Sequence, residues 1–588
     1  MASLSLRALA AALFLVNEAV AQSANETVWA SFAYVLYGER TPLQGQLVPS
    51  LTPLGAQQLY SQGSLFRARY LSSSNLSDED NAITTNSPIN GIERQALDNS
   101  QIAIYSSTDG FVVGGALAFL QGLYPPVTQE FAFNNGGNNA SILANGTMVN
   151  YPLGGYQYPN ILTVPPTDPN SVWFEGHVAC AEYWSSGNDF KNSATYQETY
   201  DATLNFYEQT WADVFPNTLA NSMLNFDYAY DLYDYAQYEY DHDASVRDAL
   251  NVNRLAILRN FADTQQFDLN GNLSASGAQE GDMIRAISGR MLAAKIVSQL
   301  SAHISSGGSA NKMTLMFGSY EPFLAFFALS DIANTASSRM FRRIPNPGAA
   351  MVFEVFTTDD DARYPTKENA WVRFLYRNGT DADSPMTEYP LFGRGNSEAR
   401  MRWSDFQTEM AKFSVQDVST WCDMCGSVTL FCAALSHSSD NSPSLSGSGE
   451  SGNPNASLSP AVAGVIGAVI ALAVLGLAAV TAFVFGGVRI RRKGPSEAIR
   501  RQSSLGGFKG AEKMASDHDV SIAKTGVRHE RVGSWELGGP GPAVTMPAPA
   551  VTPQSSLGST FGATIVRDRH EDEDSIMNVS PVSPTERV

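Results

Sequence analysis

A single apolar run near the C-terminus divides this chain into parts that meet different surroundings. Residues 462–488 form a stretch of 27 residues without any charged side chain. About 20 apolar residues let a helix cross a bilayer, so this run is long enough with some tilt. It is followed at once by four basic residues, Arg489, Arg491, Arg492 and Lys493. Because such clusters favour the cytoplasmic side, we expect 461–488 to be a single transmembrane helix and 489–588 to be cytoplasmic.

The N-terminus has the features of a secretory signal peptide. Arg7 precedes the apolar run 8–16, and the small residues of 19–21 form a cleavage motif. Residues 1–21 are therefore predicted to be removed before Gln22. The following part of the chain is predicted to lie outside the cytosol, at the plasma membrane or cell surface.

Composition separates one globular region from two segments that cannot bury a core. Residues 22–435 are rich in Tyr, Phe, Leu and Ala, as a folded ectodomain requires. Residues 436–460 are rich in Ser and Gly and predict a flexible stalk. Residues 489–588 have few aromatic side chains and several Gly/Pro runs, which is typical of a disordered tail. Short kinase-type motifs in this tail predict phosphorylation at Ser503, Ser580 and Ser583.

The charge balance excludes one class of partner. The formal net charge is −20, whereas nucleic-acid binding needs clustered Lys and Arg. The expected partners are therefore the membrane and an extracellular ligand of unknown identity. No motif indicates a metal ion or a cofactor, and none is expected.

All four cysteines precede the apolar run, in a compartment where disulfides persist. They are Cys180, Cys422, Cys425 and Cys432. Four cysteines allow three connectivities, and the sequence does not choose among them. The C-x-x-C spacing within 422–425 also permits a redox or zinc role, but no βαβ redox pattern or nearby His supports one. Two structural disulfides are therefore expected.

Seven N-x-S/T sequons precede the apolar run and predict a glycosylated ectodomain. They begin at Asn25, Asn75, Asn139, Asn145, Asn272, Asn378 and Asn455.

The globular region alternates strand-like and helix-like segments. The apolar, β-prone segment 28–36 predicts a buried strand that ends in a loop. Thr52 can cap a helix that begins at Pro53 and continues to Tyr70. Residues 101–105 predict another strand, with a helix after it, and 195–300 is helical by periodicity. Such alternation is typical of a parallel α/β sheet.

A series of motifs along 28–432 resembles a known family. Residues 36–42 are similar to an R-H-G-x-R-x-P signature, and 51–70 to the L-T-P-L-G…Q…G…R-x-R-Y helix that follows it. Further matching segments are 106–109, 119–126, 225–242, 315–322 and 344–354. In this order the segments resemble the histidine acid phosphatases. The resemblance implies a phosphoglycerate mutase-like fold, a three-layer α/β sandwich with a mainly parallel central sheet and a helical cap inserted at roughly 127–300.

The resemblance also implies where the active site would lie. In that family a His of the signature takes the phosphoryl group, Arg side chains hold its oxygens, and a later His-Asp pair completes the site. The equivalent residues here are Leu36, Tyr37, Arg40, Tyr320 and Glu321, with Phe111 or Val112 at the third Arg position. Phosphoryl transfer needs a nucleophile and cationic groups at the developing charge. The residues that would meet these two requirements are largely replaced in this sequence.

These replacements favour a catalytically inactive member that binds or senses a ligand at the cell surface. The alternative is an active, membrane-anchored acid phosphatase with an atypical site, in which Tyr37 replaces the nucleophile. A third hypothesis is a structural surface glycoprotein whose ectodomain only needs to fold.

Other conspicuous residues have structural explanations. Helical spacing in the Tyr-rich segment 226–235 predicts one packing stripe of Phe226, Tyr230 and Tyr233, with acidic residues outside it. A metal or carbohydrate site is the alternative for this segment. The histidines outside the motifs are expected to be structural or surface residues: His177, His242 and His303.

Overall fold

The computed structural model describes residues 26–72, 83–309, 311–334, 338–358, 364 and 366–440. All of them belong to one compact unit. Within these ranges no single helix is long and apolar enough to cross a membrane, although Val418–Cys425 and Leu430–Ser436 together meet that test as a pair bent by 106°. The described residues exclude the predicted signal peptide, the stalk from 441 on, the spanning segment 461–488, the tail with Ser503, Ser580 and Ser583, and the sequons Asn25, Asn75 and Asn455.

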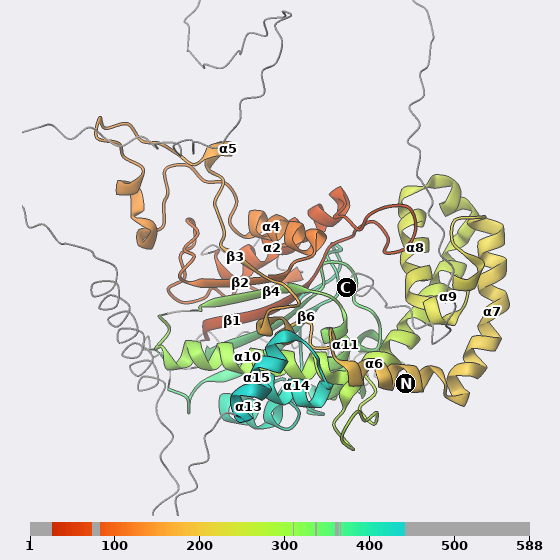
Figure 1. The fold of residues 1–588 in the computed structure, drawn as a ribbon. Coiled ribbons are helices and arrows are strands. Elements are labelled where there is room, and N and C mark those ends of the chain that lie inside the picture. Colours follow the sequence, from red (N-terminus) through yellow and green to blue (C-terminus); the bar gives the residue numbers. More distant parts are fainter. Residues whose placement is uncertain are drawn as a thin grey trace, which may run out of the picture. The chain divides into compact units, whose positions relative to one another are not determined.

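One eight-stranded sheet forms the centre of the unit, in the order β3-β2-β4-β1-β5-β6-β7, with β8 also paired to β6 (Figure 1). The strands are β1 (Thr27–Leu36), β2 (Ile102–Ser107), β3 (Ile161–Val164), β4 (Met313–Gly318), β5 (Ala350–Thr357), β6 (Trp371–Arg377), β7 (Thr387–Tyr389) and β8 (Arg400–Arg402). The half that contains the matched motifs, β3-β2-β4-β1, is parallel. The expected parallel centre is thus confirmed, and β5 to β8 extend it with antiparallel pairs.

Helices cover both faces of this sheet. In Figure 1, α2 (Pro53–Tyr70) and α4 (Gly110–Leu123) lie on one face, and α10 (Ile287–Ser305) and α13 (Trp403–Ala411) lie on the other. Nearly all of β1 is buried because it is covered on both sides, as its unbroken apolar sequence predicts. Helix α11 (Glu321–Leu329), which follows β4, packs against α10.

Two glycines let α2 and α4 pack closely against each other. A Cβ atom on Gly63 would lie 1.8 Å from the Phe119 carbonyl oxygen, and one on Gly122 would lie 2.1 Å from the Tyr60 carbonyl oxygen. Any larger residue would push the helices apart. Both glycines belong to the matched motifs, so this part of the resemblance reflects packing.

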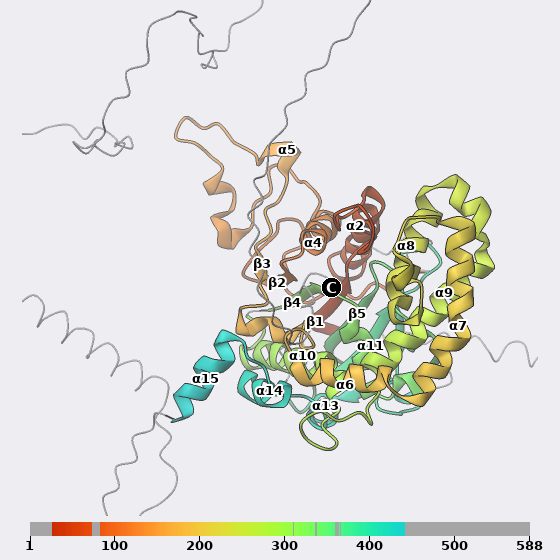
Figure 2. The ribbon, with the colours of Figure 1, turned by 45° about the vertical axis from the view of Figure 1, so that its right-hand side comes forward.

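A helical cap lies beside the sheet, at the right of Figures 1 and 2. Its helices are α6 (Ala181–Lys191), α7 (Ala194–Val214), α8 (Ala229–His242) and α9 (Ala244–Asn270). The cap has an aromatic core of its own that includes Tyr196, Tyr207, Trp211 and Phe226. The Tyr-rich segment supplies both η5 (Phe226–Tyr228) and α8.

The local features expected from sequence are present. The Thr52 hydroxyl accepts a hydrogen bond of 3.0 Å from the Gly55 N–H at the start of α2, and Pro53 is its first residue. The predicted strand at 101–105 is β2. These signals depend on residues that are close together in the chain, so they do not depend on the tertiary packing.

The cysteines form two disulfides, as expected. Cys180, just before α6, bonds to Cys425 at the end of α14 (Val418–Cys425), and Cys422 bonds to Cys432 in α15 (Leu430–Asp440). The two cysteines of the C-x-x-C motif are therefore bonded to different partners. They do not form the dithiol of a redox centre, and their thiolates are not available to zinc.

A buried carboxylate connects α2 with strands β5 and β6. Glu354 is fully buried and accepts hydrogen bonds from the Arg69 guanidinium (2.6 and 3.0 Å), the Tyr70 hydroxyl (2.6 Å) and Arg373. Arg69, Tyr70 and Glu354 all lie in matched motifs. The network therefore connects two of the matched segments, 51–70 and 344–354.

Candidate functional site

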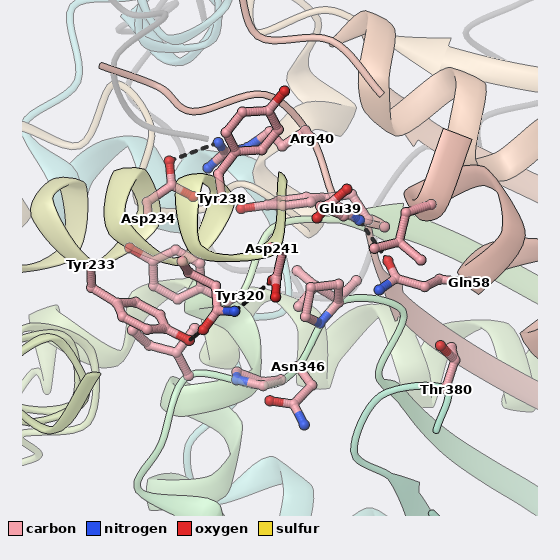
Figure 3. A pocket seen from close by; sticks show the side chains of 18 of the residues that line it. Glu39, Arg40, Gln58, Tyr233, Asp234, Tyr238, Asp241, Tyr320, Asn346 and Thr380 are labelled. Atoms are coloured by element: carbon pink, nitrogen blue, oxygen red, sulfur yellow. Dashed lines mark hydrogen bonds and ion pairs between the residues drawn. The ribbon is translucent and has the colours of Figure 1, made fainter. Parts of the chain in front are cut away.

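The motif residues meet at one edge of the parallel half of the sheet. Leu36 at the end of β1 pairs with Gly318 at the end of β4, and β2 lies on the other side of β4. The segments that leave these strand ends contain Tyr37, Tyr320 and the start of α4. This is the edge at which α/β proteins commonly bind ligands. A cavity of about 290 Å³ opens here between the sheet and α8 (Figure 3).

Tyr37, at the position of the family's nucleophile, is built into the wall of this cavity. It is 6% exposed, its hydroxyl lies 3.2 Å from the Tyr230 hydroxyl, and its ring packs edge-on against Phe111 at 5.1 Å between centroids. Burial raises the pKa of Tyr37, with Arg40 opposing the shift. The phenol is thus held neutral and is bonded to a second phenol, which is not a general base at neutral pH.

Arg40, the one Arg kept from the signature, is bonded within the protein through both terminal nitrogens. Its Nη1 lies 2.9 Å from Asp234 Oδ2 (Figure 3), and its Nη2 donates to the Tyr230 hydroxyl at 3.2 Å. Its Nε has no hydrogen-bond partner among the described residues. The guanidinium carbon lies 5.3 Å from the Tyr37 ring centroid and 5.5 Å from that of Phe111. Burial would lower the pKa of Arg40, but Asp234 raises it above its usual value. Arg40 is therefore charged, and its charge is already neutralised.

The third Arg position is resolved in favour of Phe111. Its ring contacts both Tyr37 and Arg40, whereas Val112 is fully buried in the core. A phosphoryl group at this point would therefore meet aromatic carbon instead of a guanidinium. Leu36 and Tyr37 line the same cavity.

Tyr320 and Glu321 follow β4 as expected, but they face in different directions. Tyr320 packs its ring against that of Tyr230 at 4.8 Å and donates its hydroxyl to Gln266 at 2.9 Å. Glu321 lines a different cavity, where its Oε1 lies 3.7 Å from His177 Nε2. Tyr230 and Tyr320 are the two residues that line both cavities. Their rings therefore lie between Glu321 and Tyr37.

A buried acidic group lies behind Glu321. Glu175 is 4% exposed, and burial together with nearby Asp109 and Glu321 raises the pKa of its carboxyl to about 8. The Tyr34 hydroxyl, also buried here, donates to the Ser319 and Phe174 carbonyl oxygens. Glu175 is therefore protonated at neutral pH, and these buried groups supply no positive charge to the site.

The loop after β1 is fixed to the cap helix α8 along its length. Besides the Arg40 contacts, the Leu43 N–H donates to Asp234 at 3.0 Å, and His242 Nε2 lies 3.1 Å from both carboxylate oxygens of Glu39. Glu39 also accepts from Thr52, and its N–H donates to Gln58 at 2.8 Å (Figure 3). These contacts hold helix α8 of the cap against the loop after β1.

The structure corrects one expectation about this region. Asp234, expected on the outer face of the Tyr-rich helix, turns inward to Arg40, because Tyr230 four residues earlier lies on the same helical face. His177 and His242, which lie outside the motifs in the sequence, are brought against the motif residues Glu321 and Glu39. The i,i+4 spacing of Tyr230 and Asp234 was the one signal that could have indicated the inward carboxylate.

Comparison with known families agrees with the geometry. A model of the histidine phosphatase superfamily (branch 2) matches residues 39–377. The chain belongs to this superfamily. The match includes α2 and the segments 106–109 and 315–322, whereas Leu36 and Tyr37 precede its first residue, Glu39.

Among solved structures, the chain is similar to several enzymes of low sequence identity. The phytase of Citrobacter braakii is 12% identical, with a TM-score of 0.42 over 67% of this chain and 99% of that chain. The phytase of D. castellii is 13% identical (TM-score 0.43; 72% and 88% covered), and the multiple inositol polyphosphate phosphatase of Bifidobacterium longum is 15% identical (0.35; 67% and 94%). No curated protein matches.

Superfamily membership makes the pattern of kept and lost residues interpretable. A Cβ on Gly38 would lie 2.3 Å from the Gly55 carbonyl oxygen, and one on Gly55 would lie 2.0 Å from the Glu39 carbonyl oxygen. These glycines, together with Gln58, hold the signature loop against α2. The residues that set the loop's path are kept, whereas Arg40 is the one kept residue among those that the resemblance assigns to phosphate in the signature.

Proposed function

We propose that this chain is a pseudophosphatase, which uses the histidine phosphatase scaffold to bind a ligand without hydrolysing phosphomonoesters. The observation that carries the proposal is the ion pair between Arg40 and Asp234. A phosphate ester would have to displace a buried carboxylate from the only signature guanidinium that remains. Breaking a buried ion pair costs roughly 3–5 kcal/mol, and the other Arg that lines the cavity, Arg259, is already bonded to Asn346 and paired with Asp263.

The absence of a competent nucleophile supports the same conclusion. Tyr37 is buried, its pKa is raised, and its hydroxyl is bonded to Tyr230. Loss of one transition-state donor alone typically lowers a rate by about 10²–10³. Here the nucleophile is replaced together with most of the Arg side chains that would hold the phosphoryl oxygens.

The test is hydrolysis of p-nitrophenyl phosphate by purified full-length protein in detergent, from pH 4 to pH 8. We expect no turnover above a Tyr37→Phe control. Phosphate binding, followed by calorimetry, should be undetectable at millimolar concentrations. Turnover that the Tyr37→Phe change abolishes would show that Tyr37 is a working nucleophile and would refute the proposal.

An active enzyme is the second candidate, and one observation favours it. His177 is buried and lies 3.7 Å from Glu321 at a cavity wall, as a displaced nucleophile and acid would. In that case His177→Gln, but not Tyr37→Phe, would abolish hydrolysis. We favour the inactive reading because Lys191 is the only Lys or Arg that lines this cavity.

We further propose that the domain is displayed at the cell surface. The support is the signal-peptide pattern at 1–21, the sequons, and the apolar run with its basic flank. Protease added to intact cells should remove the domain and spare the tail after 489. Full protection of the domain would refute this topology.

A further inference from the structure

A second cavity lies on the far side of the Tyr230 and Tyr320 rings, which line both spaces. Its volume is about 440 Å³, within the range of small-molecule sites. Its walls come from residues 43–44 of the loop after β1, His177, α6, η5, the start of α8, α9, Tyr320 and the first residue of α11. None of the signature residues 36–42 lines it, although Tyr320 and Glu321 belong to the later motif.

The cavity is walled by aromatic rings. Tyr183 packs against Trp184 at 4.9 Å between centroids and against His177 at 5.7 Å, and Tyr230 packs against Tyr320 at 4.8 Å. Five Tyr or Trp side chains line it in all, the fifth being Tyr228. Aromatic faces attract cations through the ring quadrupole, most strongly where water is excluded.

The ionisable side chains that line the cavity are mainly acidic. Asp227, Asp231 and Glu321 face one lysine, Lys191, and one histidine, His177. The balance is negative by one charge even with His177 protonated. Lys191 is moreover 3.9 Å from Asp227, which neutralises it locally. A phosphate or sulfate ligand is therefore disfavoured.

Glu321 is the group that most requires a partner. It is 5% exposed, and among the described residues its Oε2 has no hydrogen-bond donor. A buried carboxylate without a donor is costly, and a bound cation would offset that cost. A further carboxyl group, that of Glu175, lies near both Glu321 and Asp109, so neither of these two neighbours supplies a cation that would offset the charge of Glu321.

We propose that this second cavity binds an organic ammonium ion, held by Glu321 and by the surrounding aromatic rings. A hard metal ion fits less well, because no group of three or more metal-binding side chains occurs among the residues that the structure describes. A neutral sugar could stack on the rings but would leave the carboxylates uncompensated. The inference does not depend on the proposed function, since its test rests on Glu321 and Tyr228 and not on Tyr37 or Arg40.

The experiment is calorimetric titration of the full-length protein in detergent with choline chloride, against sodium chloride at equal ionic strength. Choline should bind, and Glu321→Gln should weaken its binding by at least about tenfold. Tyr228→Leu, which removes an aromatic face and keeps an apolar side chain, should weaken it several-fold. Asp381→Asn, which changes a carboxylate that lines only the first cavity, should leave it unchanged.

Three outcomes would overturn the inference. Choline could fail to bind above the salt control, or it could bind Glu321→Gln as tightly as the unchanged protein. Methyl glucoside could also bind in its place, which would assign the cavity to neutral sugars. Because Tyr228→Leu leaves every charge in place, it keeps the test decisive if Glu321→Gln does not fold.

Discussion

Arg40 Nη1 lies 2.9 Å from Asp234 Oδ2, and this contact joins the former phosphatase signature to the cap. The guanidinium that would hold a phosphoryl oxygen in the superfamily here holds a carboxylate of the protein itself. The Arg40 side chain is 2% exposed and that of Asp234 is 18% exposed. At this burial the ion pair fastens the loop after β1 to α8.

Removing Asp234 should therefore release Arg40 and destabilise the fold. We expect Asp234→Asn to lower the free energy of unfolding by about 3–5 kcal/mol, because a buried guanidinium loses its counter-charge. The same change should allow weak phosphate binding by calorimetry where the unchanged protein shows none. Asp241→Asn is the matched control, since Asp241 lines the same cavity and pairs with Arg247 at the surface. Equal thermal stability of the two variants would contradict the structural role of the Arg40–Asp234 pair.

Restoring the nucleophile alone should not restore catalysis. Tyr37→His leaves Arg40 bound to Asp234 and leaves Phe111 at the third Arg position. Residues that act together in catalysis are not additive, so p-nitrophenyl phosphate hydrolysis should stay at background. We expect measurable turnover only from the combined set Leu36→Arg, Tyr37→His, Phe111→Arg, Asp234→Asn, Tyr320→His and Glu321→Asp. Activity of the single Tyr37→His variant would show that the clamp is dispensable.

The sequence predicted the scaffold well because its signals are local or carried by packing. Thr52 and Pro53 mark the start of α2, and the apolar segment 28–36 forms β1. Gly38 and Gly55 keep the signature loop against α2, so they match the family although its chemistry is lost. Such residues are recognisable in a sequence because their role does not depend on distant partners.

The sequence predicted the composition of the site but not its contacts. It identified Tyr37, Arg40 and Tyr320 as neighbours through the resemblance. It did not show that Asp234 would neutralise Arg40, or that His177 would lie at Glu321, 144 positions away in the chain. These pairs depend on how the cap sits on the sheet, and a single sequence does not encode that placement in any local pattern.

The buried carboxylate Glu354 should contribute strongly to stability. Burial alone would raise the pKa of Glu354, but Arg373 and Arg69 lower it to about 2. Glu354→Gln leaves the buried Arg69 without a charge partner and Arg373 with Glu26 alone, and should cost about 3–5 kcal/mol in urea unfolding. Glu388→Gln removes one of the two partners of the more exposed Arg400, which keeps Glu26, and should cost less than about 1 kcal/mol. Similar losses in the two variants would contradict this ranking.

The same shift predicts an acid limit for the fold. The folded pKa of Glu354 lies below its ordinary value of 4.5, so its stabilising effect is complete above about pH 4.5. The effect is lost as the pH falls through about 2. Between these values the unfolding midpoint of the unchanged protein should fall more steeply than that of Glu354→Gln. Equal pH dependence of the two unfolding midpoints would mean that Arg373 and Arg69 do not lower the pKa of Glu354.

Glu175 predicts the opposite dependence on pH. Burial, with Asp109 and Glu321 nearby, raises the pKa of this carboxyl from 4.5 to about 8, so the folded protein keeps a proton that the unfolded chain loses. The stabilising effect is complete below about pH 4.5 and is lost as the pH rises through about 8. Because of this group, the free energy of unfolding of the full-length protein should be a few kcal/mol lower at pH 8.5 than at pH 5.

The variant Glu175→Gln isolates that contribution, because glutamine keeps the shape of a protonated carboxyl and cannot ionise. Its stability should change less between the two pH values than that of the unchanged protein, with the gain appearing at pH 8.5. Glu198→Gln, on the exposed face of α7, is the matched control and should follow the unchanged protein. If Glu175→Gln is no more stable than the unchanged protein at pH 8.5, Glu175 ionises in the folded protein without cost. That result would contradict the raised pKa of its carboxyl.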